Sequence, residues 1–161
     1  MAVKVGLLGS GRRLRGVVGN VLKVADGIEV TAACDTAPAA VEAAQRDFGP
    51  GVRAYDSPRE LLAESGVDWV CVGSWNRSHA EHVVSAFEAG KHVFCEKPLA
   101  LNVEDCLCMR DAWKASGILF SLGFTLRYSP HYVRVQELVA FGAFVDVISM
   151  EFNETLDFNH G

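Results

Sequence analysis

The sequence lacks the features of secreted, membrane-spanning and nucleic-acid-binding proteins. Its five cysteines show no Cys-x-x-Cys spacing, and three of them lie in apolar runs typical of buried strands, so we expect reduced core residues. No apolar run has the length of a membrane span and no signal-peptide pattern opens the chain, which favours a cytoplasmic protein. The net charge of −5 argues against nucleic acid or an anionic membrane as a partner.

Short apolar runs alternate with helical patterns along most of the chain. Six runs are predicted to form strands, at residues 3–8, 28–34, 52–55, 69–72, 92–95 and 118–122. Most of them are continuously apolar, as strands covered on both faces must be. The sequence therefore predicts an α/β fold with a doubly wound parallel sheet.

Helix start and stop signals lie between these runs. Three polar residues are predicted to cap helix N-termini, at Ser57, Ser78 and Asn102. Ser78 and Glu81 have the spacing of a capping box. A glycine able to end each of these helices follows at positions 66, 90 and 117.

The C-terminal part has a different pattern. Residues 144–154 alternate, with Ile148, Met150 and Phe152 on one face, which is typical of a half-buried antiparallel strand. Such a strand needs neighbours, so we expect the start of a second, antiparallel α+β domain truncated at the C-terminus, or a partner chain; a local hairpin is the alternative. The predicted parts are 1–122, a connecting segment with a helix at 123–143, and the truncated domain at 144–161.

A glycine turn follows the first predicted strand. In Gly9-Ser10-Gly11-Arg12-Arg13-Leu14 the glycines permit a tight turn and let backbone N–H groups approach a pyrophosphate at the next helix N-terminus. A G-x-G alone is equally consistent with a plain strand-to-helix turn. Asp35, however, ends the second strand, where a carboxylate can accept both ribose hydroxyls of an adenosine and repel a 2′-phosphate. Residues 1–122 are therefore predicted to be a dinucleotide-binding Rossmann domain that prefers NAD to NADP.

The same turn carries a cluster of basic residues. Arg12, Arg13 and Arg15 could tolerate a 2′-phosphate or contact the pyrophosphate, which would weaken the preference for NAD. For Arg15, a solvated position on the helix face is an equal alternative.

Polar residues follow the fourth and fifth predicted strands. Ser74-Trp75-Asn76 and His79 follow the fourth, and Glu96-Lys97 follows the fifth, at the edge of the sheet where ligands gather. A lysine there can stabilise a developing alkoxide, and partial burial would favour proton transfer; the alternative is that Lys97 pairs only with Glu96 or solvent. Trp75 could stack on a cofactor ring or plug the loop.

Two histidines are spaced like metal ligands on a helix. His79 and His82 lie three residues apart, but no third ligand is evident, so no metal site is predicted. We expect His79 at the nucleotide edge and His82 on a solvated face.

Taken together, these motifs resemble the Gfo/Idh/MocA family, the glucose-fructose oxidoreductase and inositol 2-dehydrogenase group. The resemblance covers nearly the whole chain and rests on Gly9-Ser10-Gly11, Asp35, Asn76-x-x-His79, Glu96-Lys97-Pro98 and Arg127-Tyr128-Ser129-Pro130. It implies NAD(P)-dependent hydride transfer between nicotinamide and a hydroxyl-bearing carbon of a sugar, cyclitol or related polyol. It further implies that Lys97 is the catalytic lysine, that Asn76, Glu96 and Arg127 lie near cofactor or substrate, and that a second domain supplies substrate contacts and the interface of a homo-oligomer.

The sequence departs from the family pattern in two respects. Leu14 occupies the third position of G-x-G-x-x-G/A, which is expected to shift the packing of the helix and weaken cofactor binding. The Asp/His pair that family members carry in the second domain has no counterpart, because Asp157 and His160 come too early in the chain. The alternative function is therefore a non-catalytic NAD-binding subunit or sensor that requires a partner chain. A redox-responsive DNA-binding regulator is a third hypothesis, against which the lack of a basic face argues.

Overall fold

The computed structural model describes residues 2–143 and 146–151. The chain divides into two compact units, residues 1–123 and 124–161. The described part of the first unit contains a six-stranded parallel sheet with the strand order β3-β2-β1-β4-β5-β6. The strands are β1 (Val3–Leu8), β2 (Ile28–Cys34), β3 (Arg53–Ala54), β4 (Trp69–Val72), β5 (His92–Cys95) and β6 (Phe120–Leu122). The predicted α/β fold with a doubly wound parallel sheet is confirmed.

The four central strands have the bounds that the apolar runs predict, whereas the two outer strands are shorter. The run at 52–55 forms β3 only over Arg53–Ala54, and the run at 118–122 forms β6 only over Phe120–Leu122. Both strands lie at an edge of the sheet and pair on one side only, β3 with β2 and β6 with β5. An edge strand forms fewer ladder hydrogen bonds, so apolar sequence alone overestimates its length.

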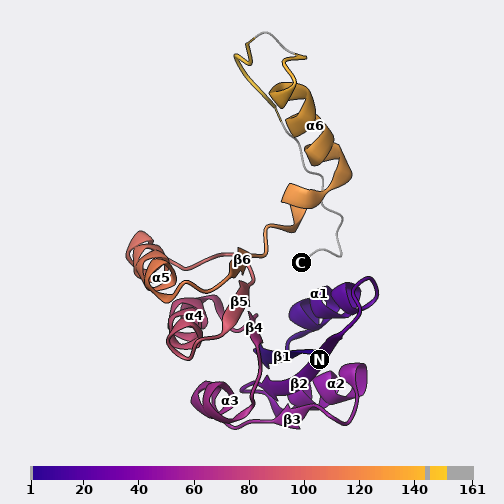
Figure 1. Cartoon of the computed structure of the whole chain (residues 1–161), viewed down its shortest axis with the longest axis vertical. Helices are drawn as coiled ribbons and strands as arrows, with labels where there is room; N and C mark the ends of the chain where they lie inside the picture. The colour runs from indigo at the N-terminus through magenta and orange to yellow at the C-terminus, as the bar shows by residue number, and fades with distance from the viewer. Residues whose placement is uncertain (1, 144–145, 152–161) are drawn as a thin grey trace. The chain divides into compact units, whose positions relative to one another are not determined.

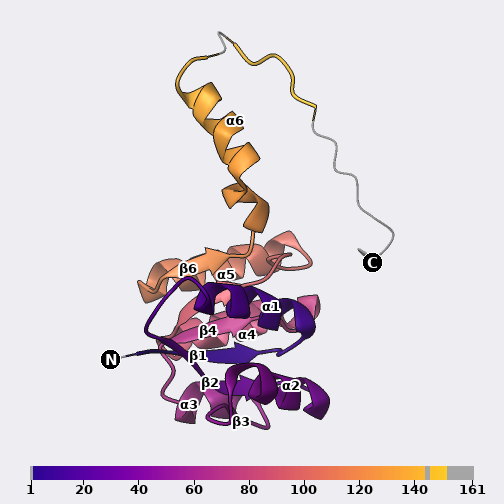
Figure 2. The same ribbon diagram turned by 90° about the vertical axis from the view of Figure 1, so that its right-hand side faces the viewer.

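Helices cover both faces of the sheet (Figures 1 and 2). One face is covered by α1 (Arg12–Leu22) and α2 (Pro38–Phe48), the other by α3 (Pro58–Glu64), α4 (His79–Glu88) and α5 (Val103–Ser116). Adjacent residues of one strand serve opposite cores: Leu7 packs with α1 and α2, and Leu8 packs with the other three helices. Because both faces are buried, the strands need continuous apolar sequence.

Two of the three predicted helix caps form. The Ser57 hydroxyl accepts a hydrogen bond from Glu60 N at 3.2 Å, and the Asn102 side chain accepts one from Asp105 N at 2.8 Å. The capping box at Ser78 and Glu81 was a wrong prediction. Residues Asn76–Ser78 form a 3-10 turn, labelled η1, that runs directly into α4, and Ser78 N donates to Trp75 O at 2.7 Å. Ser78 has helical dihedral angles, so its hydroxyl cannot take the extended geometry of an N-cap.

The strand order creates a topological switch between β1 and β4. The chain runs outward from β1 through β2 to β3 and then returns to the other side of β1 as β4. The loops after β1 and β4 therefore leave the sheet towards opposite faces. In open parallel sheets the crevice between two such loops is where ligands bind.

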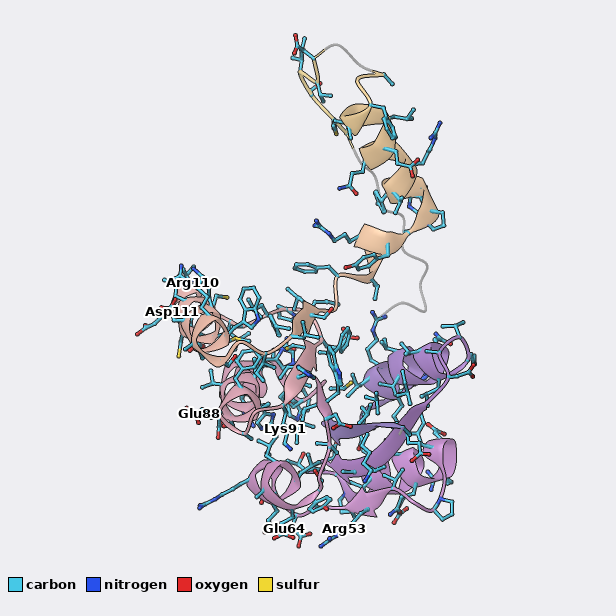
Figure 3. All side chains as sticks on the ribbon, viewed as in Figure 1. Arg53, Glu64, Glu88, Lys91, Arg110 and Asp111 are labelled. Carbon is cyan, nitrogen blue, oxygen red and sulfur yellow. The ribbon has the colours of Figure 1, made fainter. Side chains whose placement is uncertain are left out.

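Polar contacts reinforce the outer edge of the sheet. Arg53 of β3 forms an ion pair with Glu64 of α3 at 3.6 Å, and the two side chains lie together in Figure 3. The pair is well exposed, so its contribution to stability is about 1 kcal/mol or less.

All five cysteines are free, and three of them are core residues of the sheet. Burial raises the pKa of Cys71 to about 12 and that of Cys95 to about 12. These thiols are therefore protonated and unreactive near neutral pH.

The second unit contains a 3-10 turn, η2 (Thr125–Tyr128), and the helix α6 (Pro130–Ala140). Residues 146–151 have no regular secondary structure. The other residues of the strand predicted at 144–154 lie outside the described ranges, and the predicted boundaries at 122, 143 and 161 stay predictions.

Candidate functional site

A cleft of about 650 Å³ lies at the carboxyl ends of β1 to β4. Five of the predicted site residues line it: Gly9, Gly11, Asp35, Ser74 and Trp75. Thr36, Asp56, Glu81 and His82 line it as well, although none of them was predicted. Thr36 and Asp56 follow the second and third strand runs, so the position of strand ends could have identified them.

The glycine turn brings the loops after β1 and β4 into direct contact. Gly9 has a φ of +83°, and a Cβ at this position would lie 2.6 Å from the Gly73 carbonyl carbon and 2.5 Å from Ser74 Cα. Backbone bonds run from Gly9 N to Cys34 O at 2.8 Å and from Gly73 N to Leu8 O at 2.9 Å. Only glycine satisfies both the dihedral angle and the close approach.

The carboxylate of Asp35 is anchored to the glycine turn. Its Oδ2 accepts a hydrogen bond from Ser10 N at 2.7 Å, and its Oδ1 accepts one from Ala37 N at 2.9 Å. An ionised carboxylate has about four acceptor positions, so both oxygens retain the capacity to accept from a ligand. Ser10 acts differently from the prediction, because its side chain is fully buried and its N–H is already used by Asp35.

The N-terminus of α1 opens at the same cleft. Arg15 N donates to Gly11 O at 3.1 Å in the first helical hydrogen bond, so the N–H groups of Gly11, Arg12 and Arg13 have no acceptor within the helix. The first turn contains no acidic side chain to balance the positive end of the helix dipole. This end of α1 is therefore suited to an anion.

Gly11 shows that the cleft fits a molecule held against the turn. Its φ of −62° is one that any residue adopts, and a Cβ added here meets no protein atom within 4 Å. Nothing inside the protein requires glycine at this position, but a side chain would project into the cleft that Gly11 lines. The pyrophosphate of a dinucleotide is a group that needs this space.

The predicted cationic cluster is divided among separate partners. Arg15 donates from Nη1 to Ser10 O at 2.5 Å and from Nε to Asp47 Oδ2 at 2.7 Å, and its side chain is 16% exposed. It therefore braces the glycine turn against α2, which corrects the solvated alternative. Arg13 pairs with Glu96 at 3.3 Å. Two of the three arginines are thus paired with acids other than Asp35.

Leu14, the departure from the glycine fingerprint, is compensated by a glycine in the loop that follows β4. The side chain is 1% exposed, and a Cβ added to Gly73 would lie 2.8 Å from Leu14 Cβ. The small residue that lets α1 approach the sheet therefore stands at position 73 and not at 14. The expected shift of the helix is not required, because the close packing is retained.

His79 is a structural link between the loops after β4 and β5. The ring is 1% exposed, with Nδ1 2.7 Å from Pro98 O and Nε2 3.1 Å from Ser74 O. Neither ring nitrogen is left to meet a ligand directly. His79 thus positions Ser74, which lines the cleft, and Pro98, which follows the lysine.

His82 does not lie on a solvated face, contrary to the prediction. It lines the cleft and its Nδ1 is 2.9 Å from the Ser74 hydroxyl oxygen. Burial lowers the pKa of His82 below the ordinary value of 6.5, and Glu81 partly opposes this shift. The helical pattern did not reveal that His82 lines the cleft, because the side chain that it contacts, Ser74, belongs to the loop after β4.

Glu96 and Lys97 follow β5, and their side chains have opposite environments. Glu96 is buried, with Oε1 bound by Arg13 and Oε2 accepting from Lys97 N at 3.3 Å. The Lys97 side chain is exposed and has no ion pair among the described residues, so neither pairing with Glu96 nor the expected partial burial is present. The partner of Glu96 is Arg13, which joins the glycine turn to the lysine loop.

Two other predicted residues of the first unit lie at the rim of the cleft or outside it. Trp75 is 72% exposed at the rim of the cleft, and Asn76 is exposed at the start of η1. Arg127 belongs to η2 in the second unit, and its role stays a prediction.

Within the described ranges there is no candidate for a metal site or a membrane span. No three His, Cys, Asp or Glu side chains are grouped there as metal ligands. None of the helices in that part of the chain combines the length and the apolar character of a membrane span.

A family model described as an oxidoreductase family with an NAD-binding Rossmann fold matches residues 3–124. The chain belongs to the Gfo/Idh/MocA family. The resemblance inferred from the motifs is thereby confirmed, and the parallel sheet with its glycine turn is the Rossmann fold of this family.

Curated relatives of this Gfo/Idh/MocA chain include inositol dehydrogenases. It is 42% identical over 143 residues to inositol 2-dehydrogenase 3 of Saccharopolyspora erythraea, which covers 88% of this chain and 42% of that protein. It is 38% identical over 141 residues to inositol 2-dehydrogenase of Paracoccus denitrificans, covering 87% and 42%. The chain thus spans about two fifths of the length of these relatives.

Solved structures of dehydrogenases also resemble this chain. The myo-inositol dehydrogenase of Lactobacillus casei, in complex with NAD(H) and myo-inositol, superposes with a TM-score of 0.82 at 32% identity, over 88% of this chain and 42% of that one. The WlbA dehydrogenase of Bordetella pertussis, in complex with NADH and UDP-GlcNAcA, gives a TM-score of 0.81 at 27% identity, over 88% and 40%.

Proposed function

We propose that this chain is the cofactor-binding part of an NAD-dependent oxidoreductase acting on a hydroxyl-bearing carbon of a sugar, cyclitol or related polyol. The observation that carries the proposal is the shared cleft of the glycine turn and Asp35, which are hydrogen-bonded to each other at 2.7 Å. One end suits a diphosphate and the other suits ribose hydroxyls.

The chain's own residues divide the work of holding the cofactor. The N–H groups of Gly11, Arg12 and Arg13 would bind the diphosphate, and the Asp35 carboxylate would accept from the adenosine ribose. Arg15 and Glu96 support this arrangement, since they anchor the carbonyl of Ser10 and the side chain of Arg13. When bound, the nicotinamide supplies the acceptor or donor of a hydride.

The preference for NAD over NADP follows from the charges near the ribose. A 2′-phosphate would meet the anchored carboxylate of Asp35, while Arg13 and Arg15 are already paired with Glu96 and Asp47. The unfavourable interaction of like charges is therefore not offset by these two arginines.

Lys97 is the proposed catalytic residue on the strength of the family resemblance. Its exposed ammonium group follows β5, the neighbour of β4 in the sheet, and has no counter-ion among the described residues. An ammonium group beside the reacting carbinol stabilises the alkoxide that develops as the proton leaves. The Glu96 and His79 contacts hold the lysine loop from both sides, through Lys97 N and Pro98 O.

The substrate class rests on the relatives, whose names specify inositol and, for one structure, a nucleotide sugar acid. These ligands present hydroxyl-bearing ring carbons. A sugar or cyclitol is therefore the substrate we propose, with a homo-oligomer or a partner chain and a cytoplasmic location as further predictions.

The first test is fluorescence titration of this chain with NADH and NADPH. The proposal predicts saturable NADH binding and at least about tenfold weaker NADPH binding, which corresponds to about 1.4 kcal/mol. Equal binding of the two would contradict the NAD preference, and no binding of either would remove the cofactor assignment.

The second test is NAD reduction by the complete gene product in the presence of myo-inositol and a panel of sugars and polyols. We expect turnover with at least one of them. NADH binding without turnover across the panel would favour the alternative, a non-catalytic NAD-binding subunit.

A further inference from the structure

The contact between Ser74 and His82 belongs to no family motif that the sequence shows. Ser74 Oγ lies 2.9 Å from His82 Nδ1, and both residues line the cleft. Ser74 also lies against the glycine turn, since a Cβ on Gly9 would stand 2.5 Å from Ser74 Cα. The pair is therefore beside the backbone groups assigned to the diphosphate.

Two histidines fix Ser74 from opposite ends. His79 Nε2 lies 3.1 Å from its carbonyl oxygen, and His82 Nδ1 lies at its hydroxyl. With the backbone held by His79, the remaining freedom of Ser74 is the direction in which its hydroxyl proton points. That direction depends on whether Nδ1 of His82 accepts or donates.

The surroundings of His82 make its charge state variable. On α4 it has Glu81 and His79 as charged or titratable neighbours. The strand-end loops that line the same cleft contribute Asp35 after β2 and Asp56 before α3. Burial lowers the pKa of His82 below 6.5, so the ring is neutral at pH 8 and takes up a proton only at a lower pH than an ordinary histidine requires.

We propose that His82 is a positioning residue that sets the direction of the Ser74 hydroxyl, and that the affinity of the cleft for a diphosphate-linked nucleotide thereby depends on the charge of His82. The inference rests on the proposed cofactor site and deepens it. In the neutral tautomer with the proton on Nε2, the ring accepts the Ser74 proton at Nδ1 and withdraws it from the cleft. A protonated ring donates from Nδ1 to Ser74 Oγ, so the hydroxyl proton is free to donate to a phosphate oxygen, which only accepts.

The test is calorimetric titration of this chain with ADP-ribose at two pH values, pH 8 and the lowest pH at which circular dichroism shows that the chain is folded. ADP-ribose contains the adenosine diphosphate portion without nicotinamide, so it isolates this part of the site. We expect the wild-type chain to bind about fivefold more tightly at the lower pH than at pH 8, the effect of about one added hydrogen bond.

Three variants test whether the pH dependence of binding acts through the Ser74 hydroxyl. His82→Leu removes the titrating group, and His82→Asn keeps an acceptor near the position of Nδ1 without a titrating ring; both should lose the pH dependence. His82→Asn should keep the affinity that the wild type has at pH 8. Ser74→Ala should lose the pH dependence although His82 is intact, because the imidazole then has no hydroxyl to turn. Asp35, Asp56 and Glu81 are common to all variants, so the differences isolate the pair.

A matched control is His92→Asn. His92 lies at the amino end of β5, away from the cleft, and its Nδ1 accepts from Leu119 N at 3.2 Å. This variant should retain the wild-type pH dependence, and circular dichroism verifies that every variant is folded.

The results that would contradict the role of His82 differ from the result that would contradict the cofactor site. Persistence of the pH dependence in Ser74→Ala would show that His82 acts on the ligand by its charge alone. It would overturn the proposal that His82 acts by setting the direction of the Ser74 hydroxyl. Equal affinity of the wild type at both pH values would overturn it too. If ADP-ribose binds at neither pH, the cofactor site itself is refuted.

Discussion

At the scale of single residues, the site depends on a few groups whose surroundings fix their orientation. Asp35 is held by two backbone N–H groups and Arg15 by Asp47 and Ser10 O, so neither has to be ordered when a ligand arrives. Interactions that are already oriented lose less entropy on binding. The groups that we propose to hold the nucleotide are therefore oriented by contacts within the protein.

Asp35→Asn tests the ribose contact. The variant keeps the shape of the side chain but loses the charge and replaces one acceptor by a donor, so NADH should bind about tenfold more weakly, and the ratio of NADPH to NADH affinity should rise. Fluorescence titration with both cofactors measures the effect.

The control is Asp111→Asn, at an exposed acid of α5 that pairs with its neighbour Arg110 (Figure 3). It should leave both affinities unchanged. An unchanged NADH affinity in Asp35→Asn would show that this carboxylate does not contact the ribose.

Lys97→Ala tests the division between binding and chemistry. The ammonium group is exposed and has no ion pair among the described residues, so its removal should leave the fold and NADH affinity within about twofold of the wild type. Turnover by the complete gene product should fall at least about 100-fold, as expected for loss of a group acting in proton transfer. A parallel loss of NADH binding would indicate a structural role for the lysine.

The residue scale is also where sequence analysis reached its limit. Gly9, Gly11, Asp35 and Ser74 could be placed because each follows a strand run that the sequence marks clearly. His82 could not be placed, because its partner Ser74 is fixed only by the packing of α4 on the loop after β4. The Arg13 to Glu96 pair joins residues 83 positions apart, and no local pattern encodes such a distance.

At the scale of secondary-structure elements, the contact between α1 and the loop after β4 sets how closely the glycine turn approaches the sheet. Leu14 fills the space that a glycine at position 73 leaves open. The small residue that the glycine fingerprint places on the helix is here placed on the loop that faces it. The elements themselves were predictable where the sequence signal was local and strong, as in the continuous runs of the four central strands and in the start of α4 after Ser78. The side-chain cap of Ser78 was not predictable, because the preceding 3-10 turn gives this residue helical dihedral angles.

Gly73→Ala tests this packing. The added methyl group would lie 2.8 Å from Leu14 Cβ, so unfolding free energy should fall by about 2 kcal/mol through overpacking. Leu14→Gly should be destabilising by itself, but in that background Gly73→Ala should cost distinctly less, because the facing Cβ is gone. Urea denaturation of the four proteins in this cycle gives the coupling energy, and simple additivity would refute the exchange of roles between the two positions.

At the scale of the whole molecule, the sheet stabilises the site by burying apolar groups on both faces, and among these groups are thiols. The unfolded chain exposes Cys71 and Cys95 with pKa values of 9.0, whereas burial raises them to about 12 in the folded protein. A raised pKa means that the folded state retains protons that the unfolded state releases. The contribution of these two thiols to the free energy of unfolding is therefore fully present below pH 9 and is lost as the pH rises towards 12.

This linkage predicts a steep alkaline loss of stability. Each buried thiol contributes a slope of about 1.4 kcal/mol per pH unit above pH 9, which can be measured by urea unfolding in a series of buffers from pH 8 to pH 11. Cys71→Ala should reduce the slope, whereas Cys108→Ala, at an exposed cysteine of α5, should not. Identical slopes in all three proteins would contradict the account.

The whole fold was the most predictable level, because strand runs, glycine turns and their order along the chain each point to one doubly wound sheet. The second unit was the least predictable, since an alternating segment acquires a defined partner only through neighbours that its own pattern does not specify.

The central claim is that the glycine turn and Asp35 hold the two ends of one adenosine diphosphate. The most direct measurement is a crystal structure of this chain with NAD. The account predicts ribose hydroxyls within hydrogen-bonding distance of the Asp35 carboxylate and the diphosphate at the N–H groups of Gly11 to Arg13. A nucleotide bound elsewhere, or one whose ribose lies away from Asp35, would contradict it.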